Sequence, residues 1–106
     1  MQVLTRQEEI YLLAIHRLQD DAYGVRIRNQ VADMTGRKIS YGALYFTLEQ
    51  LHKKGYVTRT VGDPTPVRGG CSKIYYNLTS DGKAALKHVH ELQQNIWDGI
   101  SLLSFE

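Results

Sequence analysis

The sequence predicts a mainly helical α+β fold in which three helices precede a two-stranded hairpin and a further helix follows it. Three observations support this prediction. Apolar residues recur every three or four positions through the first half of the chain. Two β-branched and aromatic runs flank a segment rich in turn residues, and a second helical apolar pattern follows them. At 106 residues, 42% of them hydrophobic, the chain is long enough for one packed core and too short for two.

The first helix is predicted over residues 5–19. Thr5 followed three residues later by Glu8 forms a capping-box pattern, which is typical of a helix start. Tyr11 and Ile15 lie away from the main apolar stripe, so the helix is expected to be apolar on more than one face and to contact two neighbours. The main stripe consists of Ile10, Leu13, Ala14 and Leu18.

Two further stripes with clear ends predict the next two helices. One stripe ends at Gly36, a typical C-terminal stop, and predicts a helix over residues 23–35. The other follows Ser40, a favourable N-cap residue, and predicts a helix over residues 41–54. The stripes consist of Ile27, Val31 and Met34 and of Leu44, Leu48 and Leu51.

The second half of the chain predicts a hairpin followed by a long helix. The runs at residues 56–61 and 73–78 have strand composition, and the glycine- and proline-rich stretch between them predicts a long tip. Thr79 then precedes the last helix as an N-cap. Its apolar residues, at three- and four-residue steps, are Leu86, Val89, Leu92, Ile96, Trp97, Ile100 and Leu103.

Positive charge is concentrated in the middle of the chain. The formal net charge is only +2, but residues 36–76 carry seven Lys or Arg against two acids, and the segments on either side are negative. A basic segment attracts polyphosphate through Coulomb forces and counterion release, and ordinary solvated surfaces also carry charge of this size. Charge alone therefore leaves nucleic-acid binding and a solvated surface both open.

The order of elements is that of a winged helix-turn-helix, in which the third helix enters a major groove and the hairpin lies beside it as a wing. The basic segment coincides with these two elements. We therefore predict that a DNA-contacting surface extends over residues 40–76. The candidate DNA-binding residues are Tyr23, Ser40, Tyr41, Gly42, Tyr45, Phe46, Lys53, Lys54, Arg59, Arg68, Gly69, Gly70 and Lys73.

The predicted contacts differ along this surface. At the N-terminal end of the third helix, the free backbone N–H groups and the helix dipole favour a phosphate oxygen, and Gly42 lets the DNA backbone come close. The hairpin cations are expected to contact phosphates or the minor groove. Two interpretations of Phe46 remain open, an apolar contact with a thymine methyl group and an exposed aromatic without a contact.

Four motifs resemble the PadR family of transcriptional regulators over about residues 10–86. They are DAYG at 21–24, SYGALY at 40–45, LEQLHKKGYV at 48–57 and YYNLTSDG at 75–82. The resemblance implies a bacterial-type repressor with an N-terminal winged helix, similar to the short members that dimerise through a single C-terminal helix. Phe46 and Cys71 depart from the polar or basic residues that the family often has there, which lowers the expected phosphate contact.

The last helix carries more apolar surface than a domain of about 80 residues can cover, so a second copy of the chain is expected to cover it. The predicted division is a winged-helix DNA-binding domain over 1–79 and a dimerisation helix over 80–106. A two-fold dimer predicts an inverted-repeat operator. The residues expected at the dimer interface or at an effector site are Tyr11, Ile15, Val89, Leu92, Ile96, Trp97 and Ile100.

The predicted function is that of a sequence-specific DNA-binding transcriptional regulator, a homodimeric repressor released by a small molecule. Trp97 has two interpretations: a slot for a small aromatic effector between two copies, or buried interface area. The main alternative function is a winged-helix protein-interaction module that does not bind DNA. Charge reversal at Lys53, Lys54 and Arg68 distinguishes the two, because only a DNA binder should lose affinity and salt dependence.

The sequence shows no signs of catalysis or of a cofactor. His88 and His90 diverge by about 200° on a helix and cannot share a metal ion. The single cysteine, Cys71, is either a redox-sensitive thiolate or a neutral wing residue. We expect no enzyme, no metal and no cofactor. No apolar run is long enough for a membrane span and no signal peptide is evident, so the expected location is the cytoplasm.

Overall fold

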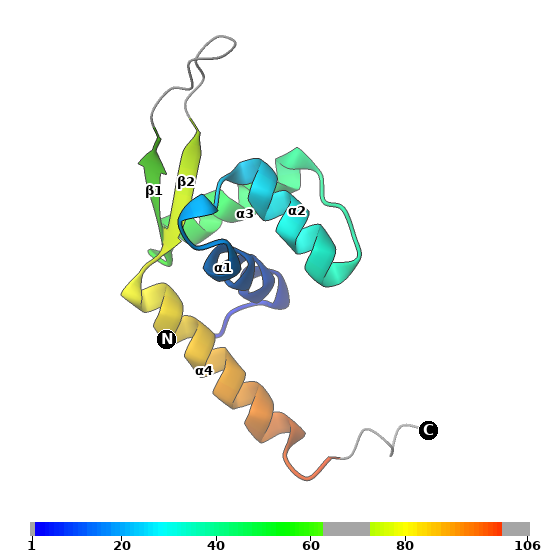
Figure 1. Cartoon of the computed structure of the whole chain (residues 1–106). Helices are drawn as coiled ribbons and strands as arrows, with labels where there is room; N and C mark the ends of the chain where they lie inside the picture. The colour runs from blue at the N-terminus through cyan, green and yellow to red at the C-terminus, as the bar shows by residue number, and fades with distance from the viewer. Residues whose placement is uncertain (1, 63–72, 101–106) are drawn as a thin grey trace.

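The computed structural model describes residues 2–62 and 73–100, and the predicted order of elements is confirmed (Figure 1). The mainly helical α+β fold has a short 3-10 helix, η1, that the sequence did not indicate. In chain order the elements are α1 (Arg6–Leu18), η1 (Gln19–Asp21), α2 (Gly24–Thr35), α3 (Tyr41–Lys53), β1 (Val57–Val61), β2 (Ile74–Leu78) and α4 (Ser80–Trp97). No helix in the described part is both long enough and apolar enough to span a membrane.

Side-chain caps set the helix starts where the sequence predicts them. At α1, the Thr5 hydroxyl accepts a hydrogen bond from the Glu8 backbone N–H at 3.1 Å, and the Glu8 carboxylate accepts one from the Thr5 N–H at 2.9 Å. At α4, the Thr79 hydroxyl accepts from the Gly82 N–H at 3.0 Å. These bonds satisfy N–H groups that a helix leaves without partners at its first turn. The predicted capping box is therefore confirmed.

The end of α4 differs from the prediction. The apolar pattern predicted a helix that continues through Ile100, but α4 ends at Trp97. Gly99 has a φ of 76°, which lies in the left-handed region and is incompatible with a continuing right-handed helix. Ile100 therefore lies beyond the helix, where it is 48% exposed. Leu103, the last residue of the predicted stripe, lies outside the described residues.

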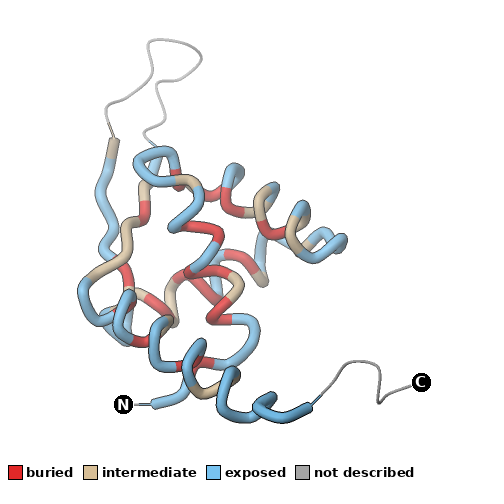
Figure 2. The backbone as a smooth tube through the Cα atoms, turned by 60° about the horizontal axis from the view of Figure 1, so that its bottom comes forward, coloured by how far each residue is buried: buried red, intermediate tan, exposed pale blue. Residues whose placement is uncertain are grey.

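The core lies where the first three helices meet, as the buried positions in Figure 2 show. The largest of the fully buried side chains come from α1, α2 and α3, whereas the far half of α4 is mostly exposed. Helix α1 contacts α2, α3, β2 and α4, so it lies at the centre of the fold. The largest completely buried aliphatic side chains are Leu12, Ile15, Ile27, Leu44, Leu48 and Leu51.

The central place of α1 corrects part of the predicted dimer interface. Tyr11 and Ile15 are each only 1% exposed, because elements of the same chain cover both apolar faces of α1. Val89 is 4% exposed and also packs into this core. The prediction that α1 has more than one neighbour is confirmed. These three residues, however, are covered within a single chain and are not available to a second copy.

The wing is an antiparallel pair of strands attached to the connection between α1 and α2. Its register pairs Val57 with Leu78. The Tyr76 N–H donates to the Ala22 carbonyl oxygen at 2.8 Å, and Tyr23 forms an isolated bridge with Tyr75. The segment just before α2 is thereby joined to the middle of β2. The predicted tip residues Arg68, Gly69, Gly70 and Cys71 lie outside the described part of the chain.

Glu8 joins the start of α1 to the end of α3. Its side chain is buried, and its carboxylate accepts a hydrogen bond from the Lys54 ammonium. Burial by itself raises the pKa of the Glu8 carboxyl. The hydrogen bond and charge of Lys54, together with the hydrogen bonds of Thr5, outweigh that effect and lower the pKa below its ordinary value.

This lowered pKa predicts a pH-dependent contribution to stability. The contribution is present above the unfolded-state pKa of about 4.3 and is lost as the pH falls through the lower folded-state pKa. We expect Glu8→Gln to lower the free energy of unfolding by about 1–2 kcal/mol at pH 7 and by less at pH 3. Thermal unfolding at both pH values measures this, with exposed Glu91→Gln as control. An equal loss at both pH values would contradict the prediction.

Candidate nucleic-acid interface

The outer face of α3 carries large exposed aromatic side chains. Phe46 is 67% exposed, Tyr45 50% and Tyr41 47%. The inner leucines of the same helix are completely buried, as the predicted helical wheel requires. Lys53 is also exposed, at the last turn of the helix. Helix α3 therefore presents a mixed aromatic and basic face to its surroundings.

The first turn of α3 is open to a ligand. The Ser40 hydroxyl accepts a hydrogen bond from the Ala43 N–H at 3.1 Å and caps the helix as predicted. The first N–H groups of a helix lack intrahelical acceptors, and here they lie among exposed residues. At Gly42 an added Cβ would meet only the Ser40 hydroxyl oxygen, at 3.9 Å. This end has the geometry and the positive dipole that suit a phosphate oxygen.

Helices α2 and α3 meet at two pairs of residues, Arg28 with Tyr41 and Gly24 with Tyr45, and the two pairs lie one helical turn apart. The guanidinium carbon of Arg28 lies 4.4 Å from the centroid of the Tyr41 ring. The Tyr45 hydroxyl lies so close to Gly24 that a Cβ there would overlap it. The two tyrosine rings stack with centroids 6.5 Å apart and planes at 20°. The exposed rings of α3 therefore rest on α2.

Arg28 is missing from the predicted set. It lies in a segment whose net charge is negative, and nothing in the spacing of α2 distinguishes it from its neighbours. Only the packing of α2 against α3 places it beside Tyr41. The signal that identifies Arg28 is therefore tertiary.

A cleft lies between the start of α2, the middle of α3 and the start of β2 in the wing. Its volume is about 290 Å³. On the wing side, the Lys73 ammonium lies 4.3 Å from the centroid of the Tyr23 ring, and the Tyr23 and Tyr75 rings meet edge to face at 5.6 Å. Three predicted DNA-binding residues from distant segments thus meet here. The lining residues are Tyr23, Gly24, Val25, Tyr45, Lys73 and Ile74.

Two other predicted contacts already have partners within the chain. The Lys54 ammonium pairs with the Glu8 carboxylate of α1, so part of its charge is already compensated within the chain. Arg59 of β1 pairs with Glu49 of α3, with its guanidinium nitrogen 3.0 Å from the carboxylate oxygen. Arg59 remains 41% exposed at its side chain. Its charge is shared with Glu49, which lowers the attraction it can offer to a phosphate.

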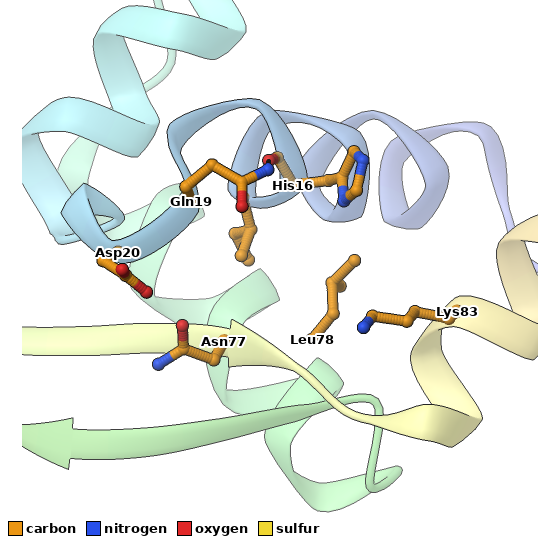
Figure 3. Close-up of a pocket in the computed structure, with 7 residues that line it drawn as sticks. His16, Gln19, Asp20, Asn77, Leu78 and Lys83 are labelled. Carbon is orange, nitrogen blue, oxygen red and sulfur yellow. Dashed lines mark hydrogen bonds between the residues drawn. The ribbon is translucent and has the colours of Figure 1, made fainter.

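A second hollow, of about 140 Å³, lies where α1, β2 and α4 meet (Figure 3). It shares no residue with the cleft beside α3. The Gln19 side-chain amide on its wall donates to the His16 carbonyl oxygen at 2.7 Å. Asp20 and Lys83 contribute opposite charges to its lining, so the hollow offers no net attraction to an anion. None of the predicted site residues except Ile15 lines it.

In a comparison with protein families, residues 12–88 match the family described as the transcriptional regulator PadR-like family. The match covers more than half of the chain and spans α2, α3 and the wing. The chain belongs to the PadR-like family. As a member of this family, the PadR-like chain is a DNA-binding transcriptional regulator and not an enzyme. The resemblance seen in the four sequence motifs is confirmed.

Solved structures similar to the PadR-like chain show its winged-helix fold. A PadR family regulator from Eggerthella lenta has 24% identity and a TM-score of 0.67, covering 90% of this chain and 80% of that one. A PadR-like transcription factor from Bacteroides fragilis has 20% identity and a TM-score of 0.71, covering 85% and 82%. A protein from Thermoplasma acidophilum that is described as a candidate transcriptional regulator has 22% identity and a TM-score of 0.66, covering 94% and 97%. A comparison with curated proteins gives no match.

Proposed function

We propose that the PadR-like chain binds an inverted-repeat operator as a homodimer, with α3 of each copy in the major groove and the wing beside it. The observation that carries this proposal is the exposed face of α3. It combines large aromatic side chains, an accessible helix N-terminus and an adjoining cleft that contains Lys73. An α-helix fits the width of a major groove, and its outer side chains then meet base edges.

The proposed contacts divide into two groups. Phe46, the most exposed of the three α3 aromatics, makes an apolar contact with a thymine methyl group, and Lys53 reaches the same groove. The backbone N–H groups of Ser40, Tyr41 and Gly42, rather than their side chains, hold a phosphate at the start of α3. Lys73 and Tyr23 contact the backbone beside the wing. Base-edge contacts specify the sequence, whereas the phosphate contacts orient the protein on the duplex.

The far half of α4 supports the homodimer. It extends away from the winged-helix core and carries exposed apolar residues, with Ile96 61% and Trp97 47% exposed (Figures 1 and 2). Leu92 is half-buried on the same helix. Apolar surface at the end of a projecting helix is stabilised when a second copy covers it. In this proposal residues 1–79 bind DNA and residues 80–106 dimerise.

Selection of bound duplexes from a random pool, together with sedimentation of the complex, tests the proposal. The expected result is an inverted repeat whose half-sites lie about one helical turn, 10 base pairs, apart, bound by two copies of the chain. One copy bound to a single half-site would contradict the homodimer. Failure to enrich any duplex would reject operator binding and favour the protein-interaction module.

We further propose that the protein is a repressor released by a small planar aromatic compound at the dimer interface. The exposed indole of Trp97, beside Ile96, offers a flat apolar surface that two copies together would form into a slot. Trp97 is the only tryptophan in the sequence, so its fluorescence reports on this place alone. Compounds that bind there are expected to quench this fluorescence and to release the operator. Quenching without release would contradict the effector role.

A further inference from the structure

We propose that Arg28 is a positioning residue for operator recognition, which holds the first turn of α3 without itself contacting DNA. The inference rests on the proposed function in one respect, namely that α3 reads the operator. It concerns the supports of that helix and is independent of the oligomeric state.

Arg28 contacts the chain on both sides of the N-cap of α3. Its Nε donates a hydrogen bond to the Ile39 carbonyl oxygen at 2.6 Å. The face of the same guanidinium lies over the Tyr41 ring, with the guanidinium carbon 4.4 Å from the ring centroid. Ser40, the N-cap, lies between these two residues in the chain. One rigid, planar group therefore holds the backbone before the cap and the side chain after it.

The ring of Tyr41 passes this support along α3. It stacks on Tyr45, one turn further along, and the hydroxyl of Tyr45 is fixed against Gly24 of α2. Gly24 lies one turn before Arg28, so α2 supports both rings from the same face. Tyr41 and Tyr45 are both about half exposed and form part of the outer face of α3. A change at Arg28 would alter the orientation of this face without removing any of its side chains.

Only arginine provides both contacts. Its Nε–H lies in the plane of the guanidinium and donates along that plane, while the face of the group stacks on an aromatic ring. Lysine keeps the positive charge but has no donor at the Nε position and concentrates the charge on a hydrated ammonium. A positioning role is therefore sensitive to Arg28→Lys. A direct phosphate contact is much less sensitive, because lysine also binds phosphate.

The experiment measures operator affinity of the full chain at several salt concentrations. We expect Arg28→Lys and Tyr41→Leu each to lower affinity about tenfold, since each removes a stacking contact and Arg28→Lys also removes a hydrogen bond. The double variant should lose little more than either single variant, and the salt dependence should match that of the unmodified chain. Tyr41→Phe, which keeps the ring, should bind within about threefold of the unmodified chain.

The opposite pattern overturns the inference. In that pattern Arg28→Lys retains affinity, whereas Arg28→Gln loses affinity and its plot of log affinity against log salt concentration becomes shallower by about 0.9. Such a result would mean that Arg28 contacts a phosphate directly. Arg26→Lys is the matched control, because Arg26 is an exposed arginine of α2 that pairs with Asp21 at 2.8 Å, and its affinity should not change. Circular dichroism establishes that each variant folds. Should Arg28→Lys not fold, Tyr41→Leu at its exposed position tests the same contact.

The unmodified chain separates this inference from the proposed function. Failure of the unmodified chain to bind any selected operator rejects the proposed function. Binding by the unmodified chain together with unaffected binding by Arg28→Lys and Tyr41→Leu rejects the positioning role alone.

Discussion

Gly82→Ala is expected to destabilise the fold more than any other glycine-to-alanine change in the described helices. A Cβ at this position would overlap the Tyr56 carbonyl oxygen, which is a backbone atom. That backbone cannot easily move, because the Tyr56 N–H donates to the Leu51 carbonyl oxygen and the Tyr56 carbonyl oxygen accepts from the Thr79 N–H, each at 3.0 Å. The first turn of α4 would have to move away from the wing.

The expected loss is about 2–4 kcal/mol in the free energy of unfolding, as for overpacking against an immobile neighbour. Chemical denaturation followed by circular dichroism measures it. Gly42→Ala is the matched control, since a Cβ in α3 meets nothing nearer than 3.9 Å. Alanine there should stabilise the helix by up to about 1 kcal/mol. A Gly82→Ala variant as stable as the unmodified chain would show that α4 tolerates displacement from the wing.

Ile96→Glu is expected to separate the proposed dimer and to weaken operator binding strongly. Ile96 is 61% exposed in a single copy, so a glutamate there leaves the fold of each copy intact. In the proposed interface the same glutamate would be a buried charge without a partner. Such a charge costs about 3–5 kcal/mol, which corresponds to a dimer weaker by a factor of roughly 150 to 4,000.

Sedimentation equilibrium measures the dissociation of the dimer, and titration of a full inverted repeat and of a half-site measures the effect on DNA binding. We expect affinity for the inverted repeat to fall toward that for the half-site. Gln94→Glu adds the same charge at an exposed position of α4 about 200° around the helix from Ile96 and should leave the dimer intact. An Ile96→Glu chain that still dimerises and binds the full operator would place the interface elsewhere.

Local sequence patterns predicted the elements well, because their causes lie within a few residues. The pairing of Thr5 with Glu8, the cap at Ser40 and the left-handed Gly36 locate helix ends through hydrogen bonds and backbone angles of neighbouring residues. The buried face of α3 follows from the spacing of its three leucines. The end of α4 was the exception, since the apolar pattern continues past the helix-ending Gly99.

The partners of charged side chains were not predictable in this way. Lys54 and Arg59 belong to the basic segment, yet the fold pairs them with Glu8 and Glu49. The contact of Arg28 with Tyr41 likewise joins two helices. Each of these pairs depends on the angle and distance at which separate elements pack. Composition shows that opposite charges or rings are present but not which of them meet.

The residues themselves predicted the order of the elements, their caps and the buried face of α3, because helix periodicity and capping are local properties. The four sequence motifs predicted membership of the PadR-like family. The assignment of apolar faces to the core or to the surface required the folded chain. Tyr11 and Ile15 are as apolar in pattern as Ile96, but neighbouring elements of the same chain cover the first two, whereas Ile96 stays exposed. Apolar residues at helical spacing predict that one face of a helix is apolar, but only the packing of the other elements decides what covers that face.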